Sequence, residues 1–247
     1  MLEIIRRRGP FSIKEIWFSK RPYLVTGYDS VIFYHCEELL SLPGFEVEEF
    51  STSVIDLTQD LDTIWRNISS SCRKGIRRAE RHGVRARETK NFEEFYSMYR
   101  SFARAKGLGD WNMGKRRFIE YIRNGMLLAA ELEGRMIAAH LYFADAKQMI
   151  SMMAPSRRFE QKGKLRAIIG HANRLLIWEA IKYGKDAGVT TFDLGGMYTG
   201  SNQNDPKYSI NQFKSEFGGK LVTVYHYHKD SGLLRIVKRT LRTKVHA

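Results

Sequence analysis

Two short segments in the last quarter of the chain carry the side chains best suited to chemistry. Residues 192–196 (FDLGG) end a predicted strand in an acid and two glycines, so the strand has a polar tip and a backbone that a ligand can approach closely. Residues 213–219 (FKSEFGG) place Lys214 between two phenylalanines. A cation in an apolar wall exerts a stronger field than in water and can stabilise negative charge that develops on an oxygen. Asp193 can accept a proton from an amine or hold its ammonium form.

The order of these two segments resembles the C-terminal signature of the FemAB family, acyltransferases related to GNAT enzymes that move an aminoacyl group onto an amine. The resemblance covers roughly residues 55–228 and includes the basic segment at residues 73–84. It implies that Lys214 lies near the reacting ester and stabilises the tetrahedral intermediate, and that Phe213 lies near the terminal adenine of aminoacyl-tRNA. The alternative for Lys214 is a surface lysine on a short amphipathic helix.

The other candidate site residues surround these segments. Asp193 has the alternative role of capping a loop. Gly195 and Gly196 are expected mainly to form a turn, and secondarily to let a ligand approach the backbone closely. Tyr198 and Tyr208 lie in the connecting loop, where a phenol can bind substrate or donate a proton to the leaving group, or can serve only in packing.

A basic loop precedes the long helix of the second half of the chain. In GNAT enzymes that bind acetyl-CoA, this turn carries closely spaced glycines whose amides hold the pyrophosphate. Here Gly163 stands alone, which weakens the case for coenzyme A. The cations of the loop can still bind the phosphates of tRNA or of a nucleotide substrate, or the loop can be simply solvated. They are Arg157, Arg158, Lys162, Lys164 and Arg166.

The charge of the chain favours an acidic partner. Its 247 residues contain 41 Lys+Arg and 27 Asp+Glu, a formal net charge of +14. We expect this partner to be tRNA or an acyl carrier protein, with an amine as acceptor, an acyl donor as co-substrate and no tightly bound cofactor. The histidines lack metal-ligand spacing, so no metal is expected. The absence of Gly-x-Ser-x-Gly and P-loop sequences leaves serine hydrolases and nucleotide triphosphatases without support.

The basic amphipathic stretch at residues 233–242 has two interpretations. It can contact an anionic membrane or clamp tRNA, or it can be a helix packed on the domain. Cys36 and Cys72 make no disulfide framework, and the chain starts without a signal peptide, so we expect a cytoplasmic protein that can be membrane-peripheral.

The pattern of elements predicts an α/β fold, with a GNAT-like mixed central sheet, helices on both faces and a small strand-rich N-terminal extension. We expect three segments: a strand-rich extension at 1–57, the acyltransferase domain at 58–228 and the basic tail at 229–247. Typical FemAB enzymes carry two GNAT-like domains, and here there is room for one, so the peptidoglycan-precursor acceptor of that family is not implied. The expected strands are 13–18, 30–34, 84–88, 126–132, 136–143, 148–154, 190–194 and 220–228, and the expected helices are 58–83, 92–106, 115–123, 165–187 and 210–217.

The sequence therefore favours an N-acyltransferase that uses aminoacyl-tRNA. Two alternatives stay open: a GNAT enzyme that takes its acyl group from coenzyme A or a carrier protein, and a non-catalytic basic protein that binds RNA or membrane on the same fold.

Overall fold

The structure, a computed structural model, describes residues 1–107 and 114–245. It divides into two compact units. The terminal unit consists of Met1–Ser51 with Val222–Ala247, and the central unit consists of Thr52–Leu221. Both chain ends thus belong to one unit, and the chain between them forms the other.

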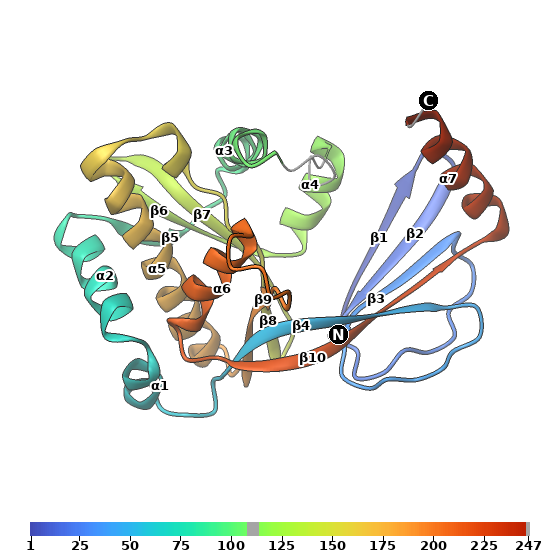
Figure 1. The fold of residues 1–247 in the computed structure, drawn as a ribbon, viewed down its shortest axis with the longest axis horizontal. Coiled ribbons are helices and arrows are strands. Elements are labelled where there is room, and N and C mark those ends of the chain that lie inside the picture. The colour runs from blue at the N-terminus through green and yellow to red at the C-terminus, as the bar shows by residue number, and fades with distance from the viewer. Residues whose placement is uncertain (108–113, 246–247) are drawn as a thin grey trace. The chain divides into compact units, whose positions relative to one another are not determined.

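The secondary structure follows the predicted order closely (Figure 1). The chain crosses from one unit to the other within β4 and again within β10. The predicted break at 107–109 lies mostly outside the described residues. The strands are β1 (Leu2–Arg8), β2 (Phe11–Trp17), β3 (Ser30–Cys36), β4 (Glu46–Asp56), β5 (Arg85–Glu88), β6 (Met126–Leu132), β7 (Arg135–Ala144), β8 (Gln148–Met153), β9 (Thr191–Gly196) and β10 (Lys220–Asp230). The helices are α1 (Leu61–Asn67), α2 (Ser70–Arg81), α3 (Phe92–Ala105), α4 (Lys115–Arg123), the 3₁₀ turn η1 (Arg157–Glu160), α5 (Gly163–Asp186), α6 (Pro206–Ser215) and α7 (Gly232–Val245).

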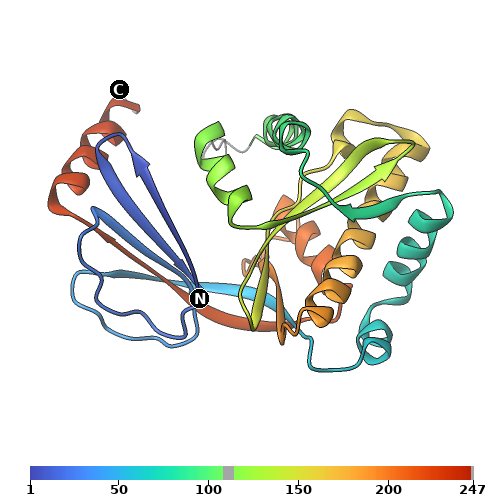
Figure 2. The same ribbon diagram turned by 180° about the vertical axis from the view of Figure 1, so that it is seen from behind.

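The central unit is a mixed sheet with helices on both faces, as the sequence predicted. Its strand order is β4-β9-β8-β7-β6-β5, with β8 and β9 parallel and the remaining pairs antiparallel. Two adjacent residues of β7, whose side chains point to opposite faces of the sheet, show which helix covers each face. The Tyr142 hydroxyl lies 3.3 Å from the Leu176 carbonyl of α5, whereas the Phe143 ring packs edge-on against Tyr121 of α4. The views in Figures 1 and 2 agree with this arrangement.

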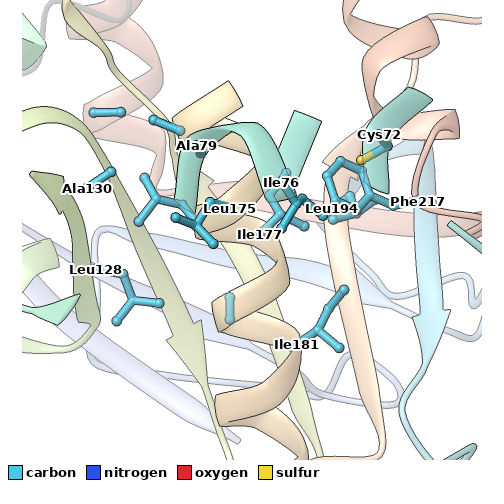
Figure 3. Packing of buried hydrophobic residues seen from close by; sticks show 14 of the residues in the cluster. Cys72, Ile76, Ala79, Leu128, Ala130, Leu175, Ile177, Ile181, Leu194 and Phe217 are labelled. Carbon is cyan, nitrogen blue, oxygen red and sulfur yellow. The ribbon is translucent and has the colours of Figure 1, made fainter. Parts of the chain in front are cut away.

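The main hydrophobic core lies under α2 and α5. The apolar stripe predicted for residues 64–79 is buried, and Figure 3 shows Cys72, Ile76 and Ala79 of this stripe. Helix α5 contributes Ile169, Ala172, Leu176 and Ala180 to the core, as predicted. Tyr183 was predicted to join that face but is 45% exposed.

The single helix predicted from Thr58 to Gly83 is in fact two helices. Asp60, not Thr58, caps the first by accepting the Thr63 amide at 2.8 Å. The backbone is extended at Ile68, and the Ser69 side chain then caps α2 by accepting the Cys72 amide at 3.2 Å. A serine that satisfies a free helix-start amide favours a new helix over continuation of the old one.

In the terminal unit the strands β1, β2, β3 and β10 are neighbours in that order, and residues 46–51 of β4 also belong to this unit. The pairs β1–β2 and β3–β10 are antiparallel and β2–β3 is parallel. Its buried cluster contains Ile16, Val31, Phe33, Cys36 and Tyr227. The strand-rich N-terminal part was predicted, but β1 and β4 were not.

The basic tail forms α7. Leu234 is buried, and Lys238 donates to Asp230 at 2.6 Å, while Leu233 and Ile236 are 63% and 65% exposed. Among the described residues, no helix combines the length and apolar character that a bilayer crossing requires.

Gly218 should be a sensitive point of the central unit. Its φ of +72° is left-handed, and a Cβ there would lie 2.7 Å from the Asn67 carbonyl oxygen at the end of α1. We expect Gly218→Ala to lower the free energy of unfolding by about 2 kcal/mol, because both the backbone conformation and the contact become strained. Urea denaturation followed by circular dichroism measures this.

The matched control is Gly170→Ala within α5, where an added Cβ meets no atom within 4 Å. Alanine in a helix interior should leave stability unchanged or raise it by about 0.5–1 kcal/mol. Equal effects of the two substitutions would contradict the assignment of strain to Gly218.

Candidate active site

The parallel pair β8–β9 positions the acid of the candidate site. Its ladder runs from the Gln148–Thr191 pair to the Ile150–Asp193 pair, although both strands continue beyond it. Asp193 therefore stands where the two strands stop pairing with each other. Ligands in open α/β sheets bind at this carboxyl end of the strands.

The Asp193 carboxylate stabilises the turn that follows it. Its Oδ1 accepts the Gly195 amide at 2.6 Å and the hydroxyl of Thr52 on β4. Gly195 has a φ of +83°, a left-handed conformation that favours glycine. Asp193 thus makes the capping contact that the sequence left as its alternative role, and it does so beside Lys214.

Lys214, near the end of α6, lies against the end of β9. Its ammonium donates to the Gly196 carbonyl at 2.7 Å, and a Cβ on Gly195 would lie 3.5 Å from Nζ. Burial lowers the pKa of Lys214 from 10.5 to about 8, while the negative charge of Asp193 acts in the opposite direction. The structure therefore brings together the acid, the glycines and the lysine that the sequence singled out.

Two aromatic residues flank Lys214 in the sequence. Phe217 is fully buried, and its ring meets that of Phe213 edge-on with centroids 5.7 Å apart. The two remaining N–H groups of the ammonium have no hydrogen-bond partner among the described residues. With a pKa of about 8, roughly nine-tenths of the side chains carry the charge at pH 7. Lys214 can thus donate hydrogen bonds to an oxygen that becomes negative.

An ion pair that the sequence analysis missed braces this segment. Arg174 of α5 binds Glu216 through two parallel hydrogen bonds, Nε–Oε2 at 2.7 Å and Nη2–Oε1 at 2.9 Å. The same guanidinium lies 5.1 Å from the centre of the Phe213 ring, and the Glu216 carbonyl accepts the Ser69 amide at 2.7 Å. The residues on both sides of Lys214 are therefore tied to α5 and α2. The signal available in the sequence was an arginine within the apolar run of α5 and an acid two residues after the lysine.

The two predicted tyrosines have different surroundings. The Asn211 side chain accepts the Tyr198 amide at 2.9 Å and donates to the Tyr198 carbonyl at 2.6 Å, which ties the loop to α6. Lys207 lies 6.0 Å from the Tyr198 ring centre. Tyr208 is half-buried on α6, and its hydroxyl makes no hydrogen bond to the described residues.

The predicted phosphate-binding cations are also unequal. Arg157 is held within the fold, since it donates to the Met136 carbonyl at 2.9 Å and pairs with Glu160 and Glu94. Lys162 and Lys164 are exposed at the start of α5 and form no ion pair with described residues.

Arg158 belongs to a group of like charges. Partial burial, and then the charges of Arg166 and Arg174, lower its pKa. Arg158, Arg166 and Arg174 make no direct contact with the Lys214 ammonium. Arg174 does contact Phe213 and Glu216, which lie close to Lys214 in the sequence.

His140 lies outside the candidate site. Its ring nitrogens contact the Tyr142 hydroxyl at 2.9 Å and Asn173 Oδ1 at 3.0 Å, and burial lowers its pKa to about 4. It is therefore neutral at pH 7 and serves the packing of α5 on β7. Among the residues that the structure describes, no three His, Cys, Asp or Glu side chains are grouped to hold a metal ion.

Comparison with known proteins places this site in a familiar domain. Residues 66–214, more than half of the chain, match the family described as acetyltransferase (GNAT) domain. No curated protein sequence matches the chain at a significant level.

Several solved structures share the fold. FemX aligns with a TM-score of 0.66 at 10% identity, over 92% of this chain and 83% of its own. The C-terminal domain of a putative lysylphosphatidylglycerol synthetase from Agrobacterium fabrum aligns with a TM-score of 0.55 at 14% identity, over 85% and 72%. L-PGS from Bacillus licheniformis aligns with a TM-score of 0.51 at 13% identity, over 84% and 70%. At these identities the likeness establishes the fold.

The buried charge of Lys214 should reduce stability. The pKa of Lys214 is lower in the folded state than in the unfolded state, so protonation of the lysine reduces the free energy of unfolding. This loss of stability is complete below about pH 8, and it disappears as the pH rises from about 8 to above the unfolded pKa of 10.5. We expect Lys214→Met to raise the free energy of unfolding by about 1–2 kcal/mol at pH 7, since the side chain is partly exposed and solvent screens part of the effect. Chemical denaturation at pH 7 and pH 10.5 measures the difference.

The control is Lys220→Met at the exposed start of β10, which should change stability little at either pH. An advantage of Lys214→Met that persists unchanged at pH 10.5 would mean that packing, and not charge, is responsible.

Proposed function

The chain belongs to the acetyltransferase (GNAT) domain family, and on this basis we propose that it is an N-acyltransferase that moves an aminoacyl group from aminoacyl-tRNA to a substrate amine. The observation that carries the proposal is Lys214, a partly buried ammonium beside the end of β9 with two N–H groups left to donate. A fixed cation in low-dielectric surroundings is suited to the oxygen of a tetrahedral intermediate.

The reaction needs few groups from the protein. The neutral amine attacks the carbonyl carbon of the ester, and the carbonyl oxygen becomes negative beside Lys214. The excess proton on the nitrogen passes to Asp193 or to a group of the substrate. The intermediate then collapses, the bond to the ribose oxygen breaks, and that oxygen leaves as a hydroxyl after gaining a proton, for which the Tyr198 phenol is a candidate donor. An amide and deacylated tRNA are the products.

Three observations favour tRNA as the donor. The turn before α5 has only Gly163 where acetyl-CoA enzymes have several glycines, and Lys162 precedes the helix without a side-chain cap. The net charge of +14 suits a polyanion. The Phe213 ring is braced by Arg174 beside Lys214, which offers a stacking surface for a terminal base. The similar fold of a putative lysylphosphatidylglycerol synthetase domain, whose name contains a lysyl group, is compatible with aminoacyl transfer on this fold.

The second candidate donor is acyl-CoA or an acyl carrier protein. The description of the matching family, acetyltransferase (GNAT) domain, favours it. In that case the same Lys214 and Asp193 act on a thioester, and the leaving group is a thiol.

Donor assays separate these candidates. The protein is incubated with a pool of amines and either a charged tRNA mixture or a set of acyl-CoAs, and products are identified by mass. We expect an amide product that requires charged tRNA and disappears when the tRNA is digested with RNase beforehand. A product formed only from acyl-CoA would replace the tRNA proposal, and no product from any donor would favour a non-catalytic binding protein.

Removal of the ammonium should abolish most of the activity. Lys214→Ala is expected to lower kcat about 10²–10³-fold, the usual effect of losing one oxyanion donor. Lys220→Ala is the matched control, because this lysine is exposed six residues later and should leave the rate unchanged. Unaltered activity of Lys214→Ala in a folded protein would eliminate the oxyanion role.

The pH profile tests the charge state. Lys214 must be protonated to stabilise an oxyanion, so kcat/KM should fall as the pH rises through about 8. Asp193 raises the pKa of Lys214, so Asp193→Asn should move this falling limb to lower pH. With one acceptor amine used throughout, a limb in the same place in both proteins, or a rate that rises across pH 8, would contradict the assignment.

A further inference from the structure

The contact between α2 and α5 brings polar side chains into a helix seam. At Gly75 of α2, an added Cβ would lie 2.9 Å from Arg174 Cδ and 3.0 Å from His171 Nδ1. Glycine is thus what lets the two helices approach, and His171 and Arg174 are the α5 residues that face α2 at this point. The His171 Nδ1 atom is buried and has no hydrogen-bond partner among the described residues.

Further arginines surround this contact. Arg78 is exposed one helical turn beyond Gly75, on the same side of α2. Burial, and then the charges of Arg174 and Arg78, lower the pKa of His171, which places both guanidiniums in its electrostatic surroundings. Arg158 lies on η1, which packs against α5, and Arg166 lies in the first turn of α5. The two extend the group, since the charges of Arg166 and Arg174, after partial burial, lower the pKa of Arg158.

This group of charges is poorly compensated. Arg174 has Glu216 as its partner, but Arg78, Arg158 and Arg166 form no ion pair with any residue of the described chain. We call these three the seam arginines. Like charges held together in a folded protein repel one another, and a bound anion removes that repulsion. Guanidinium groups recognise phosphate in particular, because their planar N–H forks match its oxygens.

The seam arginines adjoin the candidate active site through Arg174. This residue contacts the Phe213 ring and Glu216, the neighbours of Lys214 in the chain. A phosphate bound at the seam would therefore belong to a donor whose reactive end reaches Lys214. The arginines come from three elements, namely the last turn of α2, η1 and the first turn of α5, and this spread suits a strand with successive phosphates.

We propose that the seam arginines bind phosphodiester groups of the donor RNA while its acylated 3′ end is at Lys214. This inference rests on the proposed function for the identity of the donor. The same phosphate chemistry would serve the nucleotide part of coenzyme A, so the test includes both.

The experiment measures binding of deacylated tRNA by fluorescence anisotropy at several salt concentrations, and binding of coenzyme A and of inorganic phosphate by calorimetry. Arg78→Ala and Arg166→Ala should each weaken binding about 5–10-fold at low salt and reduce the slope of log K against log salt by about 1. Arg123→Ala, an exposed arginine at the end of α4, has the same charge change and should have no effect. Both test residues are exposed, and thermal unfolding confirms that the variants fold.

The outcomes separate the site from the reaction. Wild-type tRNA affinity in both variants overturns the seam inference, as does loss of coenzyme A or inorganic phosphate binding with tRNA affinity retained. If the wild-type protein transfers aminoacyl groups and the variants do so equally well at limiting tRNA, the proposed function stands and the seam inference fails. If the variants bind tRNA weakly and the wild-type protein transfers nothing from it, the seam inference stands and the proposed function fails.

Discussion

The arrangement of the candidate site depends on holding one ammonium in surroundings that disfavour its charge. Lys214 is partly buried, and its hydrogen bond to Gly196 together with the nearby Asp193 compensates only part of the lost solvation, so its pKa falls to about 8. Such a group persists only where the surrounding fold is stable enough to bear the cost. The fork between Arg174 and Glu216 and the Glu216–Ser69 contact are the features that fix the segment around it.

The two halves of the site, one on β9 and one on α6, are held in place by different kinds of contact. The β9 half is set by backbone geometry, namely the end of pairing with β8 at Asp193 and the left-handed Gly195. The α6 half is set by side chains, through the guanidinium stacked on Phe213 and the Asn211 contacts with the Tyr198 backbone. A reacting group between them would meet the end of a strand on one side and the side chains of a helix on the other.

Local sequence was sufficient for most of the elements, though not for β1 and β4, and for singling out the residues that the structure brings together at the candidate site. The FDLGG strand end and the lysine between phenylalanines were recognisable because their chemistry is contained within a few positions. The apolar stripe of α2 was equally local, but the break at Ile68 was not, because a capping serine competes with a continuous hydrophobic period.

What sequence could not supply were pairings between distant positions. Arg174 and Glu216 are 42 residues apart, and the Thr52 hydroxyl reaches Asp193 from 141 residues away. No periodicity encodes such partners, since each residue alone is an ordinary polar residue on an amphipathic element. Arg157 and the seam arginines look alike in the sequence, since all are simply basic residues. In the structure they differ, because Arg157 donates to the Met136 carbonyl and pairs with two acids that lie far along the chain or on its own turn.

The double passage of the chain between units has a consequence for how the protein is made. The central unit is continuous from Thr52 to Leu221, so all of its strands are available before synthesis ends. The terminal unit pairs Phe33 with Tyr227, so β3 must wait for nearly two hundred residues before its neighbour emerges from the ribosome. During that interval β3 presents an unpaired edge, which is a site of aggregation and of chaperone demand. The pairing of β10 with β3 therefore comes after all the strands of the central sheet have been made.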